Sequence, residues 1–206
     1  MSEDNFTLSQ PQPLLIVISG PSGVGKDTII QRMKARNLAF QFVITATTRP
    51  PRPNEVHGRD YFFYSQEEFA GMIARGDLLE YALVYNDYKG IPKQQVREAL
   101  STNKDVVMRL DVQGAETIRR LCPEALLIFL SPQDEAEMIK RLKERKTETP
   151  EDLQLRIATA RHELTQIELF DYVVVNRDDC QEETVEIIFS IITAEHHRVK
   201  QRKVTL

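Results

Sequence analysis

The sequence is poor in cysteine, in long apolar runs and in excess positive charge. Its two cysteines, Cys122 and Cys180, are too few for a disulfide framework or for a zinc site of their own. The longest apolar runs, LLIVI and ALLIFL, are far too short to span a bilayer. With a formal net charge of −4, the chain is not suited to general binding of nucleic acid. We therefore expect a cytoplasmic protein without a nucleic-acid or membrane partner.

The amino-terminal residues 1–13 are acidic and contain neither an apolar core nor an arginine. They match neither a signal peptide nor a transit peptide. We expect them to form a short disordered leader before a single domain over residues 14–200, a length that can bury a full core.

Short apolar runs alternate with helical patterns along this domain, as is typical of an α/β protein in which helices flank a parallel sheet. The runs predict buried strands over residues 14–19, 105–111, 125–130 and 171–176, and residues 40–45 are expected to join the same sheet. A glycine-rich loop ends the first strand, and the pattern after it predicts a helix from about Gly25 to Met33.

Four further helices are predicted, three of them from signals at their first residues. Ser-Pro and Thr-Pro pairs supply a cap and a proline for the first helical position, and they predict helices over 132–145 and 150–169. A capping-box pattern, a serine with glutamate three residues later, predicts a helix over 66–76. Residues 182–199 fit a closing helix with a basic tail.

Two regions do not follow this alternation of strands and helices. Residues 46–92 are rich in proline, tyrosine and charge, and residues 141–156 include a charged link between two helices. Insertions at the carboxyl edge of a parallel sheet are where substrate-binding and covering elements belong. We therefore expect a substrate-binding module at 46–92, a mobile lid at 141–156, and a core formed by residues 14–45, 93–140 and 157–200.

The loop GPSGVGKDT predicts a nucleotide site. Its glycines let backbone N–H groups surround a phosphate, and the helix that follows adds its dipole. Lys26 is placed to reach the terminal phosphates. The alternative is a plain glycine-rich turn, but the position between a buried strand and a helix favours a phosphate-binding loop. The expected ATP-binding residues of the loop are Gly20, Pro21, Ser22, Gly23, Val24, Gly25, Lys26, Asp27 and Thr28.

The segment TTRPPRPNEVHGRDY predicts a phosphate clamp. Arg49 and Arg52 lie three residues apart on a backbone that prolines hold extended, so two guanidinium groups can grip one phosphate at low entropic cost. Tyr61 adds a hydroxyl group. A solvated loop and a polyproline-type ligand for another domain are the alternatives.

Arginines on the predicted lid form a third cluster. Arg141 and Arg145 lie four residues apart on one helical face, and Arg156 lies on the next helix. Surface arginines commonly serve solubility. Their position on both sides of the charged link favours a cationic clamp that closes over a transferring phosphoryl group.

These segments stand in the order and spacing of the guanylate kinase family, which the chain resembles from about Leu14 to Ile192. The likeness is carried by LIVISGPSGVGK, TTRPPRPNEVHGRDY, LLEYA, LDVQG, KRLKERKTETPE and DYVVVN. The resemblance implies a P-loop nucleoside monophosphate kinase fold with an inserted GMP-binding module and a helical lid. It implies transfer of the γ-phosphoryl group of ATP to GMP, and to dGMP, with Mg²⁺ as cofactor. We expect a monomer or a weak homodimer.

The same resemblance implies roles for single residues. Glu80 and Thr45 are similar to the residues that recognise guanine, and a carboxylate can accept hydrogen bonds from both the ring N–H and the amino group of that base. The implied catalytic cations are Lys26, Arg141, Arg145 and Arg156. The implied adenine contacts are Arg145 and Asn176, and the implied GMP-binding residues are Thr45, Arg49, Arg52, Tyr61 and Glu80. Beyond the resemblance, we expect Lys89 and Asp111 to join the GMP-binding residues and Asp27 and Thr28 to serve as metal ligands.

Four positions depart from the family pattern. Asp27 replaces the usual loop hydroxyl, Arg109 replaces a carboxylate, Lys89 replaces a phosphate-binding tyrosine and Ile91 replaces a hydroxyl residue. We hypothesise that the first two changes compensate for each other. Either Asp27 supplies an oxygen ligand to magnesium, or Arg109 pairs with Asp27 while Thr28 or water holds the metal.

Two other functions are open at this point. One is a catalytically inactive guanylate kinase-like module that binds protein partners through its arginines. The other is a kinase for a different phosphorylated ribose compound. Lys26 and the lid arginines argue against the first, and Glu80 with the arginine segment argues against the second.

Overall fold

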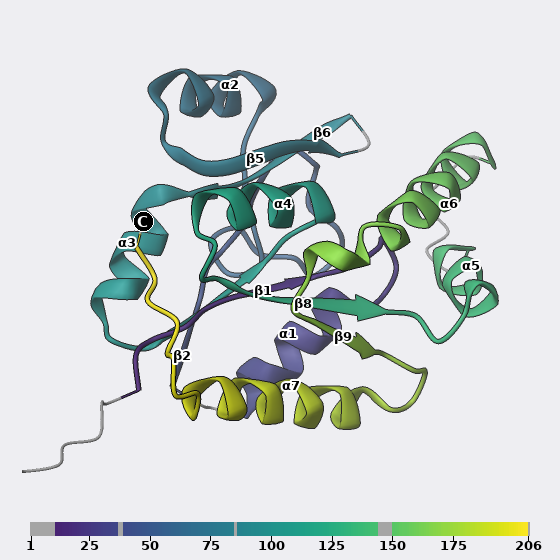
Figure 1. Ribbon diagram of the computed structural model, residues 1–206. Coiled ribbons are helices and arrows are strands. Elements are labelled where there is room, and N and C mark those ends of the chain that lie inside the picture. Colours follow the sequence, from purple (N-terminus) through teal and green to yellow (C-terminus); the bar gives the residue numbers. More distant parts are fainter. Residues whose placement is uncertain (1–10, 37–38, 85, 144–149, 206) are drawn as a thin grey trace, which may run out of the picture.

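The central sheet is parallel and lies in the middle of the molecule (Figure 1). The computed structural model describes residues 11–36, 39–84, 86–143 and 150–205. In these ranges five strands pair in the order β2-β7-β1-β8-β9, and each neighbouring pair is parallel. The strands are β1 (Leu15–Ser19), β2 (Phe40–Phe42), β7 (Asp105–Arg109), β8 (Leu126–Ser131) and β9 (Tyr172–Val175).

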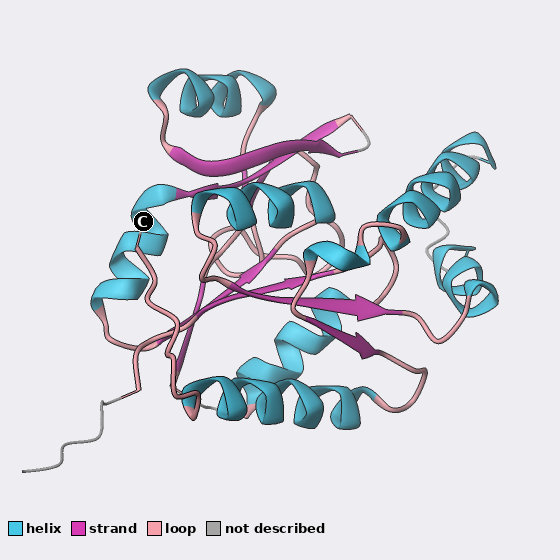
Figure 2. Cartoon of the chain, viewed as in Figure 1, coloured by secondary structure: helices cyan, strands magenta, loops and turns pink. Residues whose placement is uncertain are grey.

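Helices cover both faces of this sheet (Figure 2). Alternate residues of a strand point to opposite faces, so Ile16 and Ile18 enter one core while Leu15 and Val17 enter the other. All of β1 is buried, which explains why its first four residues are all apolar. The first core is closed by α1 (Lys26–Ala35) and α7 (Gln181–His196), and the second by α3 (Lys93–Ser101) and α4 (Val112–Leu121).

The region proposed from the sequence as a substrate module contains a second sheet, on the far side of α4 in Figure 1. Its strands have the order β4-β3-β6-β5 among the described residues. The predicted capping box is confirmed, since Ser65 Oγ accepts a hydrogen bond from Glu68 N at 3.1 Å and Ser65 N donates to the Glu68 carboxylate. The elements are β3 (Ala46–Thr47), β4 (Phe62–Phe63), α2 (Gln66–Arg75), β5 (Leu78–Val84) and β6 (Asp87–Pro92).

Two helices, α5 (Glu135–Lys143) and α6 (Pro150–Leu164), pack against each other and project from the carboxyl edge of the sheet (Figure 1). Their contact buries Met138, Leu142 and Ala160. The domain and lid boundaries given above stay predictions. No helix in the described ranges is long and apolar enough to cross a membrane.

One predicted helix start was wrong. Ser131 does not cap a helix, because it belongs to β8 and pairs with Val175 of β9. The helix α5 starts at Glu135 instead. Asp134 caps it by accepting a hydrogen bond from Glu137 N at 2.8 Å, while Gln133 N donates to the Glu137 carboxylate at 2.8 Å. Strand pairing therefore outweighed the Ser-Pro signal.

Several predicted elements extended past the ends found in the structure, and two of them show the cause. The strand expected over 40–45 pairs only as Phe40–Phe42. The helix expected to reach residue 169 ends at Leu164, and a separate 3₁₀ helix, η1 (Ile167–Leu169), follows it. Apolar spacing continued across that break, so periodicity alone could not place it.

Candidate active site

A cavity of about 240 Å³ lies where the glycine-rich loop, the second sheet and α6 meet. Six cationic and four acidic side chains from the described residues line it. Such a concentration of lysine and arginine fits a ligand that carries phosphate. The predicted site residues that line it are Ser22, Gly23, Val24, Gly25, Lys26, Asp27, Thr28, Thr45, Arg49, Arg52, Tyr61, Lys89, Asp111 and Arg156.

The loop follows β1 and leads into α1, as predicted. Gly20, Gly23 and Gly25 have φ angles of 137°, 86° and 95°. Residues other than glycine rarely adopt such positive φ angles. The ammonium group of Lys26 donates hydrogen bonds to the carbonyl oxygens of Gly20 and Pro21. The lysine therefore folds back over the loop and lines the cavity from that position.

We expect Gly20→Ala to destabilise the protein by at least about 2 kcal/mol, because it combines backbone strain with a steric clash. A Cβ at this position would lie 2.2 Å from the carbonyl oxygen of Leu130. Urea unfolding measures the difference. The matched control is Gly71→Ala within α2, which should be neutral or stabilising by up to about 1 kcal/mol because alanine favours a helix. Equal stabilities of the two variants would contradict the close packing of the loop on β8.

Glu163 is a site residue that the sequence reasoning missed. It comes from α6, lines the cavity, and its Oε2 accepts a hydrogen bond from Ser22 N at 3.3 Å. Burial raises the pKa of Glu163, and burial lowers the pKa of Lys26 from 10.5 to about 8 while the charge of Glu163 opposes that shift. In the sequence Glu163 is one of several acidic residues on a predicted helix, so only the tertiary contact reveals it.

The two arginines of the predicted clamp both line the cavity, and Glu55 fixes them. Arg49 forms an ion pair with the Glu55 carboxylate at 2.9 Å, and the backbone N–H of Arg52 donates to the same carboxylate at 2.7 Å. The guanidinium carbon of Arg49 lies 5.2 Å from the centre of the Tyr61 ring. The second residue missed from the sequence is therefore Glu55, which holds the guanidinium of Arg49 and the backbone of Arg52.

Asp27 and Arg109 form an ion pair between the start of α1 and the end of β7. This ion pair is the one expected in the second of the two arrangements considered above, and the metal ligands stay a prediction. Arg109 also donates to the carbonyl oxygen of Asp60 at 3.2 Å, and its guanidinium carbon lies 4.2 Å from the centre of the Tyr61 ring.

Glu80 is buried next to Gly114 and is not among the residues that line the cavity. Its side chain comes from β5 and is only 4% exposed. A Cβ added to Gly114 at the start of α4 would come within 2.8 Å of its Oε2. Burial and the charge of Asp111 raise the pKa of Glu80 well above its usual value. Ile91, opposite Glu80 on β6, is fully buried and belongs to the core of the protein.

Thr45 and Lys89 complete the side of the cavity next to Asp111. The Thr45 hydroxyl donates to the carbonyl oxygen of Arg109 at 3.3 Å. Asp111 caps α4 by accepting a hydrogen bond from Gly114 N at 2.9 Å. Burial lowers the pKa of Lys89, and the charges of Asp111 and Asp27 oppose that shift.

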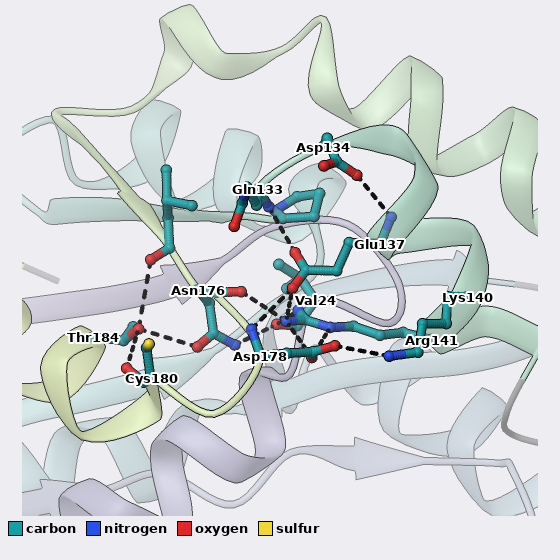
Figure 3. A network of polar contacts seen from close by, with 12 residues as sticks. Val24, Gln133, Asp134, Glu137, Lys140, Arg141, Asn176, Asp178, Cys180 and Thr184 are labelled. Atoms are coloured by element: carbon teal, nitrogen blue, oxygen red, sulfur yellow. Dashed lines mark hydrogen bonds and ion pairs between the residues drawn. The ribbon is translucent and has the colours of Figure 1, made fainter.

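Arg141 and Asn176 bind the glycine-rich loop at the backbone of Val24 (Figure 3), and neither of them lines the cavity. Arg141 donates to the carbonyl oxygens of Val24 at 3.2 Å and Asn176 at 2.8 Å, and pairs with Glu137 and Asp178 at 2.9 Å. The Asn176 amide donates to Val24 O at 2.7 Å. The guanidinium of Arg141 therefore binds the loop backbone and two neighbouring carboxylates. Arg156 lines the cavity, whereas Arg145 lies outside the described residues.

The cavity offers oxygen ligands that fit magnesium. The carboxylates of Asp27 and Asp111 and the hydroxyl of Thr28 all line it. Among the described residues, no group of three acidic, histidine or cysteine side chains is arranged to hold a metal ion. Mg²⁺ commonly takes one or two protein oxygens and completes its shell with phosphates and water, so the donor set suits an ion that enters with a nucleotide.

The comparisons with known proteins agree with this geometry. The family model described as guanylate kinase matches residues 12–195. Guanylate kinase 2, chloroplastic/mitochondrial, of Oryza sativa subsp. japonica is 51% identical over 197 residues, covering 95% of this chain and 69% of that protein. Guanylate kinase of Clostridium tetani is 44% identical over 190 residues, covering 92% and 90%.

Among solved structures, that of guanylate kinase from Anaplasma phagocytophilum matches with a TM-score of 0.77 at 24% identity, covering 93% of this chain and 90% of the other. At that identity the match supports the fold, which is the predicted α/β arrangement of a P-loop kinase. The sequence comparisons carry the assignment further, because both the family model and the curated relatives span nearly the whole chain. The chain therefore belongs to the guanylate kinase family.

Proposed function

We propose that the protein transfers the γ-phosphoryl group of ATP to GMP, giving ADP and GDP. The observation that carries the proposal is a single cavity lined by the phosphate loop with Lys26 and by the clamp arginines Arg49 and Arg52. One set of groups suits the donor phosphates and the other suits the phosphate of an acceptor. The curated relatives are named guanylate kinases.

In this proposal the protein acts by positioning two phosphates and neutralising the charge that moves between them. The loop amides and Lys26 hold the donor phosphates. Arg49, Arg52 and Tyr61 hold the acceptor phosphate, and Arg156 adds positive charge from α6. No side chain needs to form a covalent intermediate, because the acceptor phosphate oxygen attacks directly.

Thr28 and Asp111 are the residues we propose to hold Mg²⁺, in part through water, while Asp27 stays paired with Arg109. When bound, the ion supplies positive charge to the phosphate oxygens. No observation favours an inactive binding module, since Lys26, the arginine clamp and Arg156 all line the cavity.

Arg156 and Arg141 are the lid arginines within the described residues, and their substitution should change different kinetic parameters. Arg156→Met is expected to lower kcat by about 10²-fold with a small change in stability, because a cation facing the moving charge is lost. Arg141→Met is expected to raise KM for ATP and to lower the melting temperature, because it removes one of the two hydrogen bonds to Val24 O and the ion pairs with Glu137 and Asp178. Steady-state kinetics and thermal unfolding measure both. If Arg141→Met changed kcat alone, its assignment to the loop backbone would be wrong.

The proposed activity is tested by measuring ADP formation from ATP and Mg²⁺ with GMP, AMP, UMP or CMP as the acceptor. We expect strong turnover with GMP and weak turnover with the other three. Equal turnover with AMP would contradict the assignment of the base, and no turnover with any acceptor would contradict the reaction.

A cytoplasmic location and a monomer or weak homodimer are part of the proposal. The relative from rice is named for the chloroplast and mitochondrion, so location in particular needs a direct measurement. Fractionation of cells and sedimentation of the purified chain are suitable tests.

A further inference from the structure

Arg109 has no role in the proposed reaction so far, yet its guanidinium stands between the two phosphate sites. It lies at the carboxyl end of β7 and lines the cavity, with 14% of its side chain exposed. A largely buried guanidinium is costly unless charged and polar partners surround it. The groups that Arg109 contacts therefore indicate its role.

Those partners belong to two separate parts of the molecule. On one side Arg109 forms the ion pair with Asp27, which directly follows Lys26 at the start of α1. On the other side it donates to Asp60 O at 3.2 Å and stacks near the Tyr61 ring at 4.2 Å.

The Tyr61 ring also connects to the acceptor clamp. The Arg49 guanidinium carbon lies 5.2 Å from its centre, and Tyr61 itself is buried. A chain of contacts thus runs from the donor loop through Asp27, Arg109 and Tyr61 to Arg49. Each link is a charged or cation–π contact with limited freedom to slide.

We propose that Arg109 is a positioning residue that couples the donor phosphate loop to the acceptor-phosphate clamp. This inference rests on the proposed function and deepens it. Phosphates that bind the loop fix the start of α1 and hence Asp27. Arg109 transmits that position to Tyr61 and Asp60, so that the clamp is already arranged when GMP binds. The coupling is reciprocal, since each ligand must favour the other by the same factor.

The test measures the dissociation constant of GMP by calorimetry, with and without a saturating non-hydrolysable ATP analogue and Mg²⁺. In the unaltered protein we expect the analogue to tighten GMP binding by about fivefold to tenfold, within the usual range for coupled sites. In Arg109→Met the ratio should fall towards one. Asp27→Asn breaks the same link from its more exposed end and should have the same effect. The control Arg75→Met removes an exposed charge from α2 and should leave the ratio unchanged.

The outcomes separate this inference from the proposed function. Failure of GMP to bind the unaltered protein would contradict the function itself. Normal GMP binding with a ratio near one in the unaltered protein would contradict the coupling. The same ratio in the unaltered protein and in folded Arg109→Met and Asp27→Asn would show that Arg109 has only a structural role. If Arg109→Met does not fold, Asp27→Asn and Arg109→Lys decide. The lysine variant should recover only part of the ratio, because it keeps the charge but not the planar group.

Discussion

Replacing Lys26 with methionine is expected to lower kcat by about 10²- to 10³-fold, the size of effect that follows loss of one preorganised charge at a transition state. The side chain reaches over the loop to Gly20 O and Pro21 O and lines the cavity. Methionine has a similar length, so it fills the same space while removing the charge and the two hydrogen bonds to the loop. Steady-state kinetics with saturating ATP and GMP measure the loss. A variant with unchanged kcat would exclude Lys26 from the transfer step.

The same lysine should take up a proton when ATP binds. Burial lowers the pKa of Lys26 to about 8 in the ligand-free protein, and neighbouring phosphates would raise it again. At a pH of about 9 the free lysine is mostly neutral and the bound lysine mostly charged, so binding should absorb protons and weaken as pH rises. Calorimetry in two buffers of different ionisation enthalpy measures the uptake. Lys26→Met should abolish it, and equal uptake in the variant would assign the proton elsewhere.

Replacing Glu80 with glutamine is expected to raise KM for GMP by about 10²-fold while the dissociation constant of ATP stays nearly unchanged. Guanine presents two N–H groups that a carboxylate can accept, and an amide in that place turns one acceptor into a donor. Burial strengthens the effect, since Glu80 is 4% exposed and water cannot replace the lost bond. Equal losses for ATP and GMP would contradict the assignment of Glu80 to the base.

The pH dependence of GMP binding gives a second test of Glu80. Burial and Asp111 raise the pKa of its carboxyl group, and only the ionised form accepts both hydrogen bonds. KM for GMP should therefore increase as pH falls through that raised pKa, and the trend should be absent in Glu80→Gln. The matched control, Glu67→Gln at the exposed start of α2, should behave as the unaltered protein. A trend that survives in Glu80→Gln would place the titrating group elsewhere.

The parts of the fold that the sequence predicted are those with local signals. The buried strand before the glycine-rich loop, the loop itself and the capping box at Ser65 all depend on neighbours in the chain, and the structure contains each of them. The wrong helix start at Ser131 shows the limit of this reasoning. A Ser-Pro pair caps helices in general, but here the serine has a partner on β9 that local sequence does not reveal.

In the candidate site, too, groups of residues close together in the sequence were easier to predict than contacts between distant segments. The loop and the pair of clamp arginines are each confined to a short segment of the sequence, and both line the cavity. Glu163 is 141 residues from its loop partner Ser22, and Arg109 is 82 residues from Asp27. Glu163 gave no signal of its own, because one charge on a helix is indistinguishable from a solvated one. The pair of Asp27 and Arg109 did give a signal, since two unusual residues with opposite charge occurred in motifs that meet at one edge of the sheet.

The most direct test of the proposed reaction follows the phosphoryl group itself. The purified protein is incubated with Mg²⁺, GMP and ATP labelled at the γ-phosphate, and the labelled products are separated. We predict that the label appears in the β-phosphate of GDP in an amount equal to the ADP formed. Label recovered as inorganic phosphate, or label that remains in ATP while GMP is bound, would contradict transfer between the two sites.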